Sequence, residues 1–463
     1  MKRSGPGGAR PRRRRRRGRG WALPLLLACL RVAAADEPAA DSRWPQLLGA
    51  QYTYILQGQS PLHSPYAGPL SLDPRGDVQA THTIGFYSGW APLRGVELYL
   101  DAEKFMGAGV SGATGLAGLT NGDVVREGAA SLKKEFYIAR LFARFVYPLG
   151  GDLSPVERVQ DQLPGQSFTR RLELKAGRLA ANDDFDRNRY ASSPRTQFLN
   201  WSLWDNTAWD FAADTRGYTD GAVLGWFERS WTLRFGLYRM PFVANGQTLE
   251  TLSRAQSANL ELTLAPRPEG PIVRLLAYRN RGRMGDYREA LERARLLGMV
   301  PSVAADDRDG RHKSGFGINA ELPLADGGDT GLFARLGADD GATESFVFTE
   351  VDRHLSAGGQ LAGVRWGRPA DVLGAALALH GIVGVHREYL AAGGVGFVLG
   401  DGRLNYAPEQ ILEAYYRLQL WDTVGPLRVR VQLSPDLQYV RNPAYNADRG
   451  PVWFYGLRLH VEY

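Results

Sequence analysis

The sequence predicts an all-β protein, a transmembrane antiparallel β-barrel of about sixteen strands that follows an N-terminal signal peptide. Three observations lead to this fold class. The C-terminal segment alternates between apolar and polar residues, and the same alternation recurs along most of the chain. The single long apolar stretch lies near the N-terminus and has the length of a signal peptide core, which is shorter than a membrane-spanning helix.

The last eleven residues read as one amphipathic strand. Every second residue, counted back from the end, is apolar: Tyr463, Val461, Leu459, Leu457, Tyr455 and Trp453. The residues between them are polar or small, apart from Phe454. Successive side chains of a strand point to opposite faces, and about ten residues cross a bilayer as a tilted strand. We expect this segment to close the barrel against the first strand, because an open edge in lipid leaves backbone groups without hydrogen-bond partners.

The first 35 residues are predicted to be a signal peptide, separate from the barrel domain at 36–463. A basic region that includes the arginines at 12–17 precedes an apolar stretch at 21–30. Three alanines at 33–35 then supply the small residues that a signal peptidase recognises. Two alternatives are a basic arm that binds nucleic acid and a lipoprotein signal that ends at Cys29, and both fit the apolar stretch and the alanines less well.

The composition of the remaining chain restricts its partners. The first 35 residues hold eleven of the 56 lysines and arginines and none of the 49 acidic residues. The rest therefore carries 45 basic against 49 acidic groups, so the sequence does not predict a nucleic-acid partner. The only cysteine, Cys29, also lies in the leader, which leaves no disulfide, so stability must come from a large closed fold.

Alternating segments follow one another along the chain. The clearest strand candidates span 48–56, 83–90, 95–103, 137–147, 231–237, 273–277 and 429–433. Glycine-rich stretches at 107–122, 326–329 and 337–342 are predicted to be turns between strands. In 95–103 the polar face contains Glu97, Tyr99, Asp101 and Glu103. About 428 residues without an obvious linker fit one barrel of roughly sixteen strands.

Charged residues occupy the middle of the polar face in several of these strands. Besides the carboxylates of 95–103, they include Arg140, Arg144, Arg234 and Arg274. Tyr137 is expected on the opposite, apolar face of its strand. A soluble two-sheet sandwich explains one such strand equally well, but mid-strand charges in strand after strand favour a water-filled lumen.

Two segments do not read as strands. The stretch 286–297 consists of helix-forming residues and ends at Gly298, which is typical of a helix C-terminus, so we expect a helix in a solvated loop. The segment 182–214 is rich in Asp, Arg, Asn and Trp and is too long for a turn. Loops of this length are usually functional or disordered, and its three tryptophans indicate order.

Several sequence segments, taken in their order along the chain, match those of one known family. They are 63–72, 115–122, 182–186, 195–198, 204–217, 405–410, 436–439, 442–451 and the terminal strand. Taken together, they resemble the carbohydrate-selective outer-membrane porins of the OprB type. The resemblance implies a sixteen-stranded barrel in the bacterial outer membrane, diffusion-driven sugar uptake without a cofactor, and a constriction made of charged side chains. The long arginine-rich leader departs from the family pattern.

The candidate substrate-binding residues follow from the chemistry of sugars. Aromatic rings stack on the apolar face of a pyranose, and charged groups bond its hydroxyls. Alternation directs six residues to the lumen: Glu97, Asp101, Arg140, Arg144, Arg234 and Arg274. The loop at 182–216 is expected to fold inward and adds Asp183, Asp184, Arg195, Trp204, Trp209 and Arg216. The competing interpretation is that these charges pair with wall neighbours and that the tryptophans only anchor the loop or lie in the interface girdle.

These features predict an outer-membrane porin that passes small, glucose-type sugars by passive, carbohydrate-selective diffusion through a charged eyelet. A general diffusion porin and a non-conducting surface or structural barrel are the alternatives. Motifs of serine hydrolases, phosphate-binding loops and zinc hydrolases are missing, so neither an enzyme nor a metal site is expected. Calcium binding at Asn182, Asp183, Asp184 and Asp186 is the weaker alternative for that loop, because the spacing is not that of a known calcium loop.

The predicted partners follow from the predicted location. They are small sugars as permeants, outer-membrane lipid and lipopolysaccharide, and the barrel-assembly machinery during biogenesis. The protein is expected to be a monomer or a loose trimer. No cofactor and no nucleic acid are expected.

Overall fold

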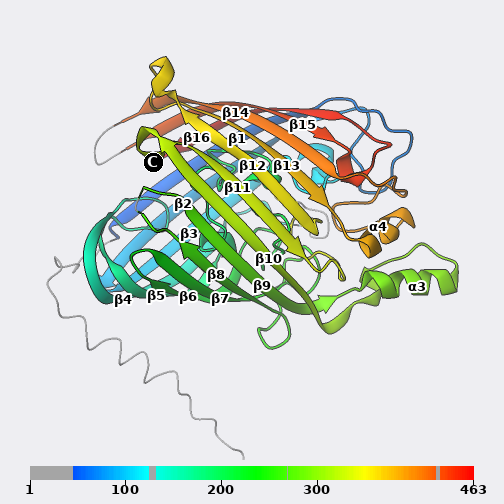
Figure 1. The fold of residues 1–463 in the computed structure, drawn as a ribbon, viewed down its shortest axis with the longest axis horizontal. Coiled ribbons are helices and arrows are strands. Elements are labelled where there is room, and N and C mark those ends of the chain that lie inside the picture. The colour runs from blue at the N-terminus through cyan, green and yellow to red at the C-terminus, as the bar shows by residue number, and fades with distance from the viewer. Residues whose placement is uncertain (1–44, 125–131, 268, 424–427) are drawn as a thin grey trace, which may run out of the picture. The chain divides into compact units, whose positions relative to one another are not determined.

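The computed structural model describes residues 45–124, 132–267, 269–423 and 428–463. Within them, sixteen antiparallel strands form one closed barrel, as the sequence predicts (Figure 1). The first strand, β1 (Leu47–Gln59), pairs with the last, β16 (Val452–Glu462), in a register that runs from Gln51 opposite Glu462 to Gln59 opposite Phe454. The predicted signal peptide at 1–35, with Cys29, lies outside the described residues.

The other strands follow one another around the barrel in chain order. They are β2 (Asp77–Leu93), β3 (Val96–Gly107), β4 (Tyr137–Val156), β5 (Gly165–Leu179), β6 (Thr219–Phe227), β7 (Trp231–Arg239), β8 (Gln256–Leu264), β9 (Ile272–Met284), β10 (Arg308–Ala325), β11 (Thr330–Asp339), β12 (Arg353–Ala362), β13 (Val372–Gly381), β14 (Glu409–Asp422) and β15 (Arg430–Arg441). Every strand pairs only with its two neighbours, so no strand edge is left open.

Short helices lie in the connections between strands. The α-helices are α2 (Trp201–Trp204), α3 (Tyr287–Leu297) and α4 (Gly384–Ala391). The 3-10 turns are η1 (Val110–Ala113), η2 (Ala181–Asp183), η3 (Ala304–Asp306), η4 (Asp326–Gly328), η5 (Gly363–Trp366) and η6 (Pro443–Tyr445). In the described part of the chain, no helix combines the length and the apolar character needed to cross a membrane.

The predicted loop helix at 286–297 is confirmed as α3. Its N-terminus is capped by Asp286, whose carboxylate accepts hydrogen bonds from the backbone N–H groups of Arg288 and Glu289. It ends where Gly298 adopts the left-handed conformation, with φ of 64°. The C-terminal signal, Gly298, is local in sequence, which is why it could be recognised there.

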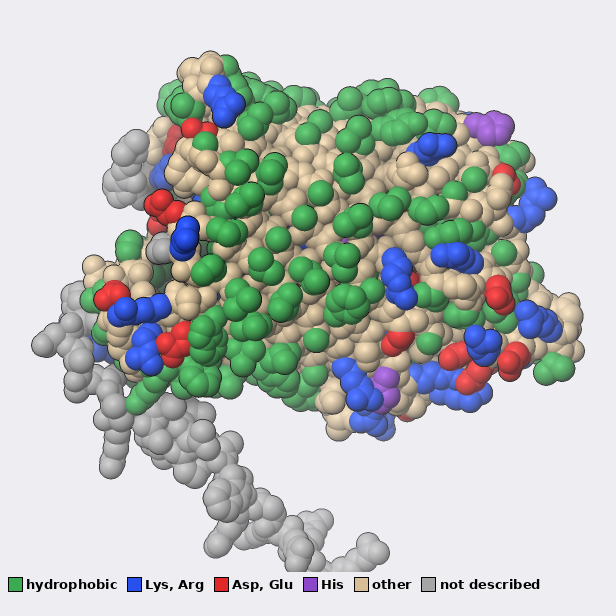
Figure 2. All heavy atoms as spheres, in the orientation of Figure 1, with side chains coloured by type: hydrophobic (Ala, Val, Ile, Leu, Met, Phe, Trp, Pro, Cys, Tyr) green, Lys and Arg blue, Asp and Glu red, His purple; other side chains and the backbone are tan. Residues whose placement is uncertain are grey.

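The strands turn apolar side chains outward and polar side chains inward. In β16, Trp453, Tyr455 and Leu457 are exposed on the outer surface, whereas Arg458 and His460 are buried inside. Figure 2 shows hydrophobic side chains across the middle of the visible barrel face and charged side chains toward its two ends. An apolar outside around a polar inside is the arrangement of a barrel that lies in lipid.

The two rims of the barrel differ in the length of their connections. One rim, called here the short-turn rim, contains tight connections such as 94–95 and 228–230, and both β1 and β16 have their chain-terminal ends there. The other, the long-loop rim, contains the connection at 180–218 and the helices α3 and α4 (Figure 1).

The prediction for Tyr137 was wrong. The register between β3 and β4 shifts where Asp101 faces Arg140 and Ala102 faces Ile138, so that β4 carries one extra residue. Such a bulge exchanges the faces of the residues beyond it. Ile138 therefore points outward, and the Tyr137 hydroxyl donates to Glu103 Oε2 at 3.2 Å inside the barrel.

The depth of an outward side chain in the membrane leads to a first prediction. Leu457 lies in the middle of β16 and is 41% exposed, whereas Val461 lies near the short-turn rim. Leu457→Arg should lower the free energy of unfolding by about 2–4 kcal/mol, and the control Val461→Arg by about 0–1 kcal/mol. Denaturant unfolding in liposomes measures both, and equal losses would contradict a lipid-facing β16.

Candidate functional site

The connection between β5 and β6, at 180–218, is folded into the barrel. The backbone N–H of Leu199 donates to Glu413 Oε1 of β14 at 2.5 Å, and the Asn200 amide donates to Gln438 of β15 at 2.9 Å. From β16, Arg458 donates to the carbonyl oxygens of Pro194 and Gln197, both at 2.7 Å. The loop thus crosses the lumen and reaches strands far from those it connects.

Asp186 is the central anchor of this inward loop. Its carboxylate accepts from Nε of Arg335 in β11 at 2.9 Å and from the Asn319 amide of β10 at 2.7 Å. The same arginine, fully buried, also donates to the Leu203 carbonyl oxygen at 3.0 Å. The backbone N–H of Asp186 donates to Glu261 of β8 at 2.7 Å. These contacts bind the loop to three strands of the wall.

The acidic residues proposed as calcium ligands lie on basic side chains of the wall instead. Asp183 pairs with Arg140 at 2.7 Å, Asp184 pairs with Lys175 at 2.6 Å, and Asp186 pairs with Arg335 at 2.9 Å. Burial by itself raises the pKa of Asp183, but the charge of Arg140 outweighs it and holds the pKa below the ordinary value. Across the described ranges, no group of three or more His, Cys, Asp or Glu residues is placed to hold a metal ion.

Two further segments, 108–124 and 340–352, also fold inward, and both contact the 180–218 loop at Trp201. The backbone N–H of Trp201 donates to the Leu119 carbonyl oxygen at 2.8 Å, and its ring stacks on Phe348 at 4.6 Å between centroids. The backbone N–H of Glu350 donates to Ala117 at 2.9 Å, which joins the two added segments to each other. The sequence predicted only turns at 107–122 and 337–342, because nothing local distinguishes an inward loop from an outward one.

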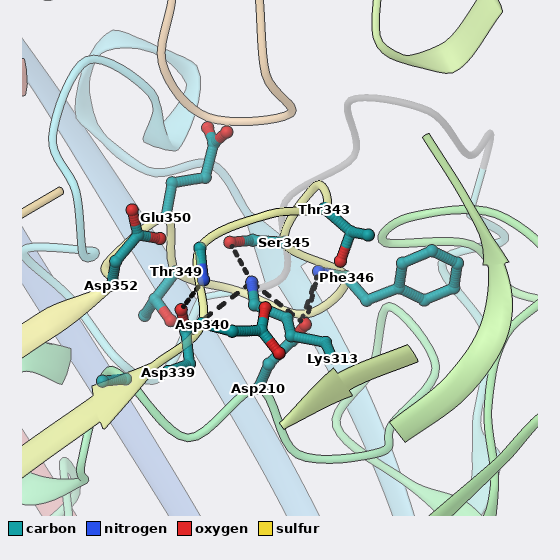
Figure 3. Close-up of polar contacts among 12 residues, drawn as sticks. Asp210, Lys313, Asp339, Asp340, Thr343, Ser345, Phe346, Thr349, Glu350 and Asp352 are labelled. Carbon is teal, nitrogen blue, oxygen red and sulfur yellow. Dashed lines mark hydrogen bonds and ion pairs between the residues drawn. The ribbon is translucent and has the colours of Figure 1, made fainter. Parts of the chain in front are cut away.

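A buried lysine of the barrel wall contacts two of the inward segments, 180–218 and 340–352 (Figure 3). Nζ of Lys313, in β10, lies 3.4 Å from Asp339 of β11 and 3.6 Å from Asp210 of the 180–218 loop. It also donates to Oγ of Ser345 at 3.0 Å. Asp210 in turn accepts hydrogen bonds from the backbone N–H groups of Phe346 and Val347. A single ammonium group therefore fixes both loops.

A cavity of about 560 Å³ remains between the inward loops and the wall. Its aromatic lining consists of Phe105, Tyr137, Trp201, Trp204, Phe211, Tyr218 and Phe348. Its basic lining consists of Arg140, Arg187, Arg195, Arg216, Arg417 and Arg430, and its acidic lining of Glu103, Asp123, Asp161, Asp183 and Glu462. Aromatic faces and paired charges thus border the same space.

The carboxylates of the cavity are all paired with arginines. Arg195 binds Glu103 and Asp123, each at 3.0 Å. Arg140 binds Asp183 at 2.7 Å and lies 3.3 Å from Asp161. Arg430 binds Glu462 at 2.8 Å.

Three arginines of the lining have no such partner. Among the residues that the structure describes, no carboxylate lies within 4.0 Å of Arg187, Arg216 or Arg417. Arg216 instead lies over the ring of Tyr137, at 4.5 Å from its centroid, and Arg417 donates to the Thr196 carbonyl oxygen at 3.2 Å. Among the described residues, the cavity lining therefore carries more unpaired positive than negative charge.

The connection between β4 and β5, at 157–164, reaches the cavity from the short-turn rim. The Gln160 amide donates to Asp101 Oδ2 at 2.5 Å, and the backbone N–H of Leu163 donates to the Tyr99 hydroxyl at 3.1 Å. Burial raises the pKa of Asp161 well above its ordinary value, and the neighbouring carboxylates of Asp101 and Asp183 raise it further against the effect of Arg140.

The structure brings five of the twelve candidate residues to the cavity. They are Arg140, Asp183, Arg195, Trp204 and Arg216. Sequence reasoning missed Trp201, Phe348, Glu103 and Asp123, although Glu103 could have been found from the alternation of β3.

The other seven candidates lie in the wall or in the loop packing. Glu97 pairs with Arg144 at 2.9 Å, Asp101 with Arg140 at 3.2 Å, Asp184 with Lys175 at 2.6 Å, and Arg274 with Glu321 at 3.1 Å. Arg234 lies 3.9 Å from Glu261, and the buried ring of Trp209 donates from Nε1 to Asn259 at 2.9 Å. These positions match the wall pairing and loop anchoring that compete with direct sugar contact.

A closed sixteen-strand barrel with an apolar outside and inward loops around a polar cavity is a porin, a diffusion channel of the bacterial outer membrane. The model of the carbohydrate-selective porin family, OprB, matches residues 90–463, and the chain belongs to this family. Family and fold indicate a channel rather than an enzyme. In barrels of this kind the short turns are periplasmic, so the long-loop rim is extracellular.

One solved structure shares the fold at low sequence identity. OprB of Pseudomonas putida, in a high-pH structure, is 13% identical, with a TM-score of 0.64 over 90% of this chain and 94% of that one. The outer-membrane channel DcaP of Acinetobacter baumannii is 8% identical, with a TM-score of 0.48 over 90% and 96% of the two chains. A search of curated proteins found no match.

Removal of the buried lysine should loosen the inward loops. Lys313→Met leaves Asp210 and Asp339 buried without a cation, which should cost about 3–5 kcal/mol of unfolding free energy. Single-channel recordings should show a larger and noisier conductance, because both tethered loops gain freedom.

Two variants serve as controls for this prediction. Lys313→Met/Asp339→Asn should recover part of the lost stability, since it also removes one uncompensated charge. Lys104→Met, on the outer surface of β3, should change neither quantity. A Lys313→Met protein with unchanged stability and conductance would show that the lysine does not hold the loops.

The unpaired arginines predict a weak preference for anions. In a planar bilayer with a KCl gradient, the reversal potential should show chloride passing more readily than potassium. The triple variant Arg187→Gln/Arg216→Gln/Arg417→Gln should abolish or reverse this preference for chloride. The control Arg365→Gln, in a periplasmic turn, should preserve it. A cation-selective wild-type channel would contradict the prediction.

Proposed function

We propose that the protein passes small, uncharged sugars of the glucose type into the periplasm by passive, carbohydrate-selective diffusion. The cavity formed by the 180–218 loop and the wall is the proposed eyelet. Its volume of about 560 Å³ lies within the roughly 300–1,000 Å³ range of small-molecule sites. Membership in the carbohydrate-selective family supports the substrate class.

The observation that carries this proposal is the meeting of aromatic and ion-paired side chains around one space. Trp201 and Trp204 line the cavity, and Arg140 and Arg195 line it together with their carboxylate partners Asp183 and Glu103. A sugar ring presents a C–H face that packs on aromatic rings and an edge of hydroxyls that both donate and accept hydrogen bonds. The carboxylates accept from these hydroxyls, and the guanidinium groups donate to them.

The roles of the twelve candidates separate under this proposal. The five that line the cavity, Arg140, Asp183, Arg195, Trp204 and Arg216, contact the passing sugar. Of the remaining seven, Asp101 holds Arg140, whereas Glu97, for example, pairs with Arg144 elsewhere in the wall. Because ion pairs hold the guanidinium groups of Arg140 and Arg195 in place, this part of the eyelet keeps its geometry without a bound sugar.

Liposome swelling with refolded protein tests the proposal. Glucose should enter faster than an uncharged non-sugar of the same size, and a larger disaccharide should enter more slowly. Trp204→Leu should reduce the advantage of glucose, because one apolar stacking face is lost. The matched control is Trp209→Leu, since Trp209 belongs to the same loop but does not line the cavity.

The other outcomes decide between the alternatives. Rates that depend on solute size alone would make the protein a general diffusion porin. Absence of swelling with folded protein would make it a non-conducting barrel. An equal loss of the glucose advantage in both tryptophan variants would assign the effect to loop packing rather than to sugar contact.

A further inference from the structure

The outer surface of β8, β9 and β10 changes from apolar to basic between one outward row of residues and the next row toward the extracellular rim. Strand register places Leu260, Ala277 and Phe316 in one outward row. The next row toward the extracellular rim holds Ala258, Arg279 and Ser314, and the row after it holds Gln256, Arg281 and His312. Adjacent rows are about 7 Å apart along a strand, so the arginines lie directly above the lipid-facing surface.

A shallow hollow opens among these basic side chains. It has a volume of about 430 Å³ and is lined by Gln256, Ala258, Arg279, Arg281, Gly310 and His312. The small residues Ala258 and Gly310 leave the space that larger side chains would fill. Figure 2 shows charged side chains of both signs and a histidine at this end of the barrel, beside the apolar surface.

In the described residues, the two arginines of the hollow form no ion pair with a carboxylate. In the described chain, no carboxylate lies within 4.0 Å of Arg279 or Arg281, and Arg281 donates only a long hydrogen bond, 3.4 Å, to the Ser253 carbonyl oxygen. Neighbouring arginines do have acidic partners: Arg308 and Arg311 bind Glu289 at 2.8 and 2.6 Å. Within the described ranges, the hollow thus concentrates positive charge from two arginines that have no carboxylate within 4.0 Å.

We propose that this hollow, Arg279 and Arg281 with His312 and Gln256, binds a phosphate group on the headgroup of a glycolipid in the outer leaflet. The planar guanidinium fork suits two oxygens of one phosphate, and basic pockets next to the hydrocarbon bind phosphorylated headgroups. A lipid, rather than free phosphate, is the occupant because Leu260 and Phe316 lie one row below and can pack against its acyl chains. This inference is independent of the proposed sugar selectivity.

Binding of diphosphorylated lipid A to the full-length protein in detergent tests the proposal. The wild-type protein should bind it saturably, and Arg279→Ala/Arg281→Ala should weaken binding at least tenfold. The matched control, Arg94→Ala/Arg365→Ala, removes two exposed arginines from periplasmic turns and should retain wild-type affinity. Glucose-driven liposome swelling should be unchanged in both double variants, which also shows that they fold.

Three results would overturn the proposal. One is equal affinity for lipid A in the two double variants. The second is equal affinity of the wild-type protein for lipid A from which the phosphates have been removed. The third is inorganic phosphate that displaces lipid A at comparable concentration, because it would make the hollow a site for free phosphate rather than for a lipid headgroup.

Discussion

Backbone hydrogen bonding in lipid is the constraint on which the rest of this structure depends. A strand edge inside the bilayer would leave N–H and C=O groups without partners, so the sheet must close, and β1 pairs with β16 to complete it. Closure forces each strand to divide its side chains between lipid and lumen with a period of two. The polar and charged residues of every strand are thereby collected in one enclosed space.

The inward loops follow from that enclosed charge. Charged side chains that line a narrow lumen are costly unless they are paired, and many of the partners come from the loops. Arg335 and Lys313 hold the 180–218 loop through Asp186 and Asp210, and Arg140 binds Asp183. The same interactions narrow the lumen to a cavity of about 560 Å³, so the stability of the barrel interior and the size of this cavity have one physical origin.

Local patterns predicted most of the fold and a smaller part of the site. The closing strand, the clear alternation of β3 and the capped helix α3 depend on residues that are near one another in sequence. Tyr137 was assigned to the wrong face, because a bulge in β4 is a property of the pairing with β3. The inward course of 108–124 and 340–352 was also not predicted, since their partners lie on distant strands.

The sequence by itself determined the class of this protein, a membrane barrel with charges on its inner face, because alternation and strand length are local. Only the tertiary structure decided which of those charges border the cavity inside the barrel. Arg140 and Arg195 line the cavity, whereas Glu97 and Arg144 pair within the wall. The alternating pattern predicts whether a side chain points inward. It does not predict how far along the barrel axis the side chain lies or which residue it meets across the lumen. Those depend on register and on loops that bring Trp201 against Phe348, which are far apart in sequence.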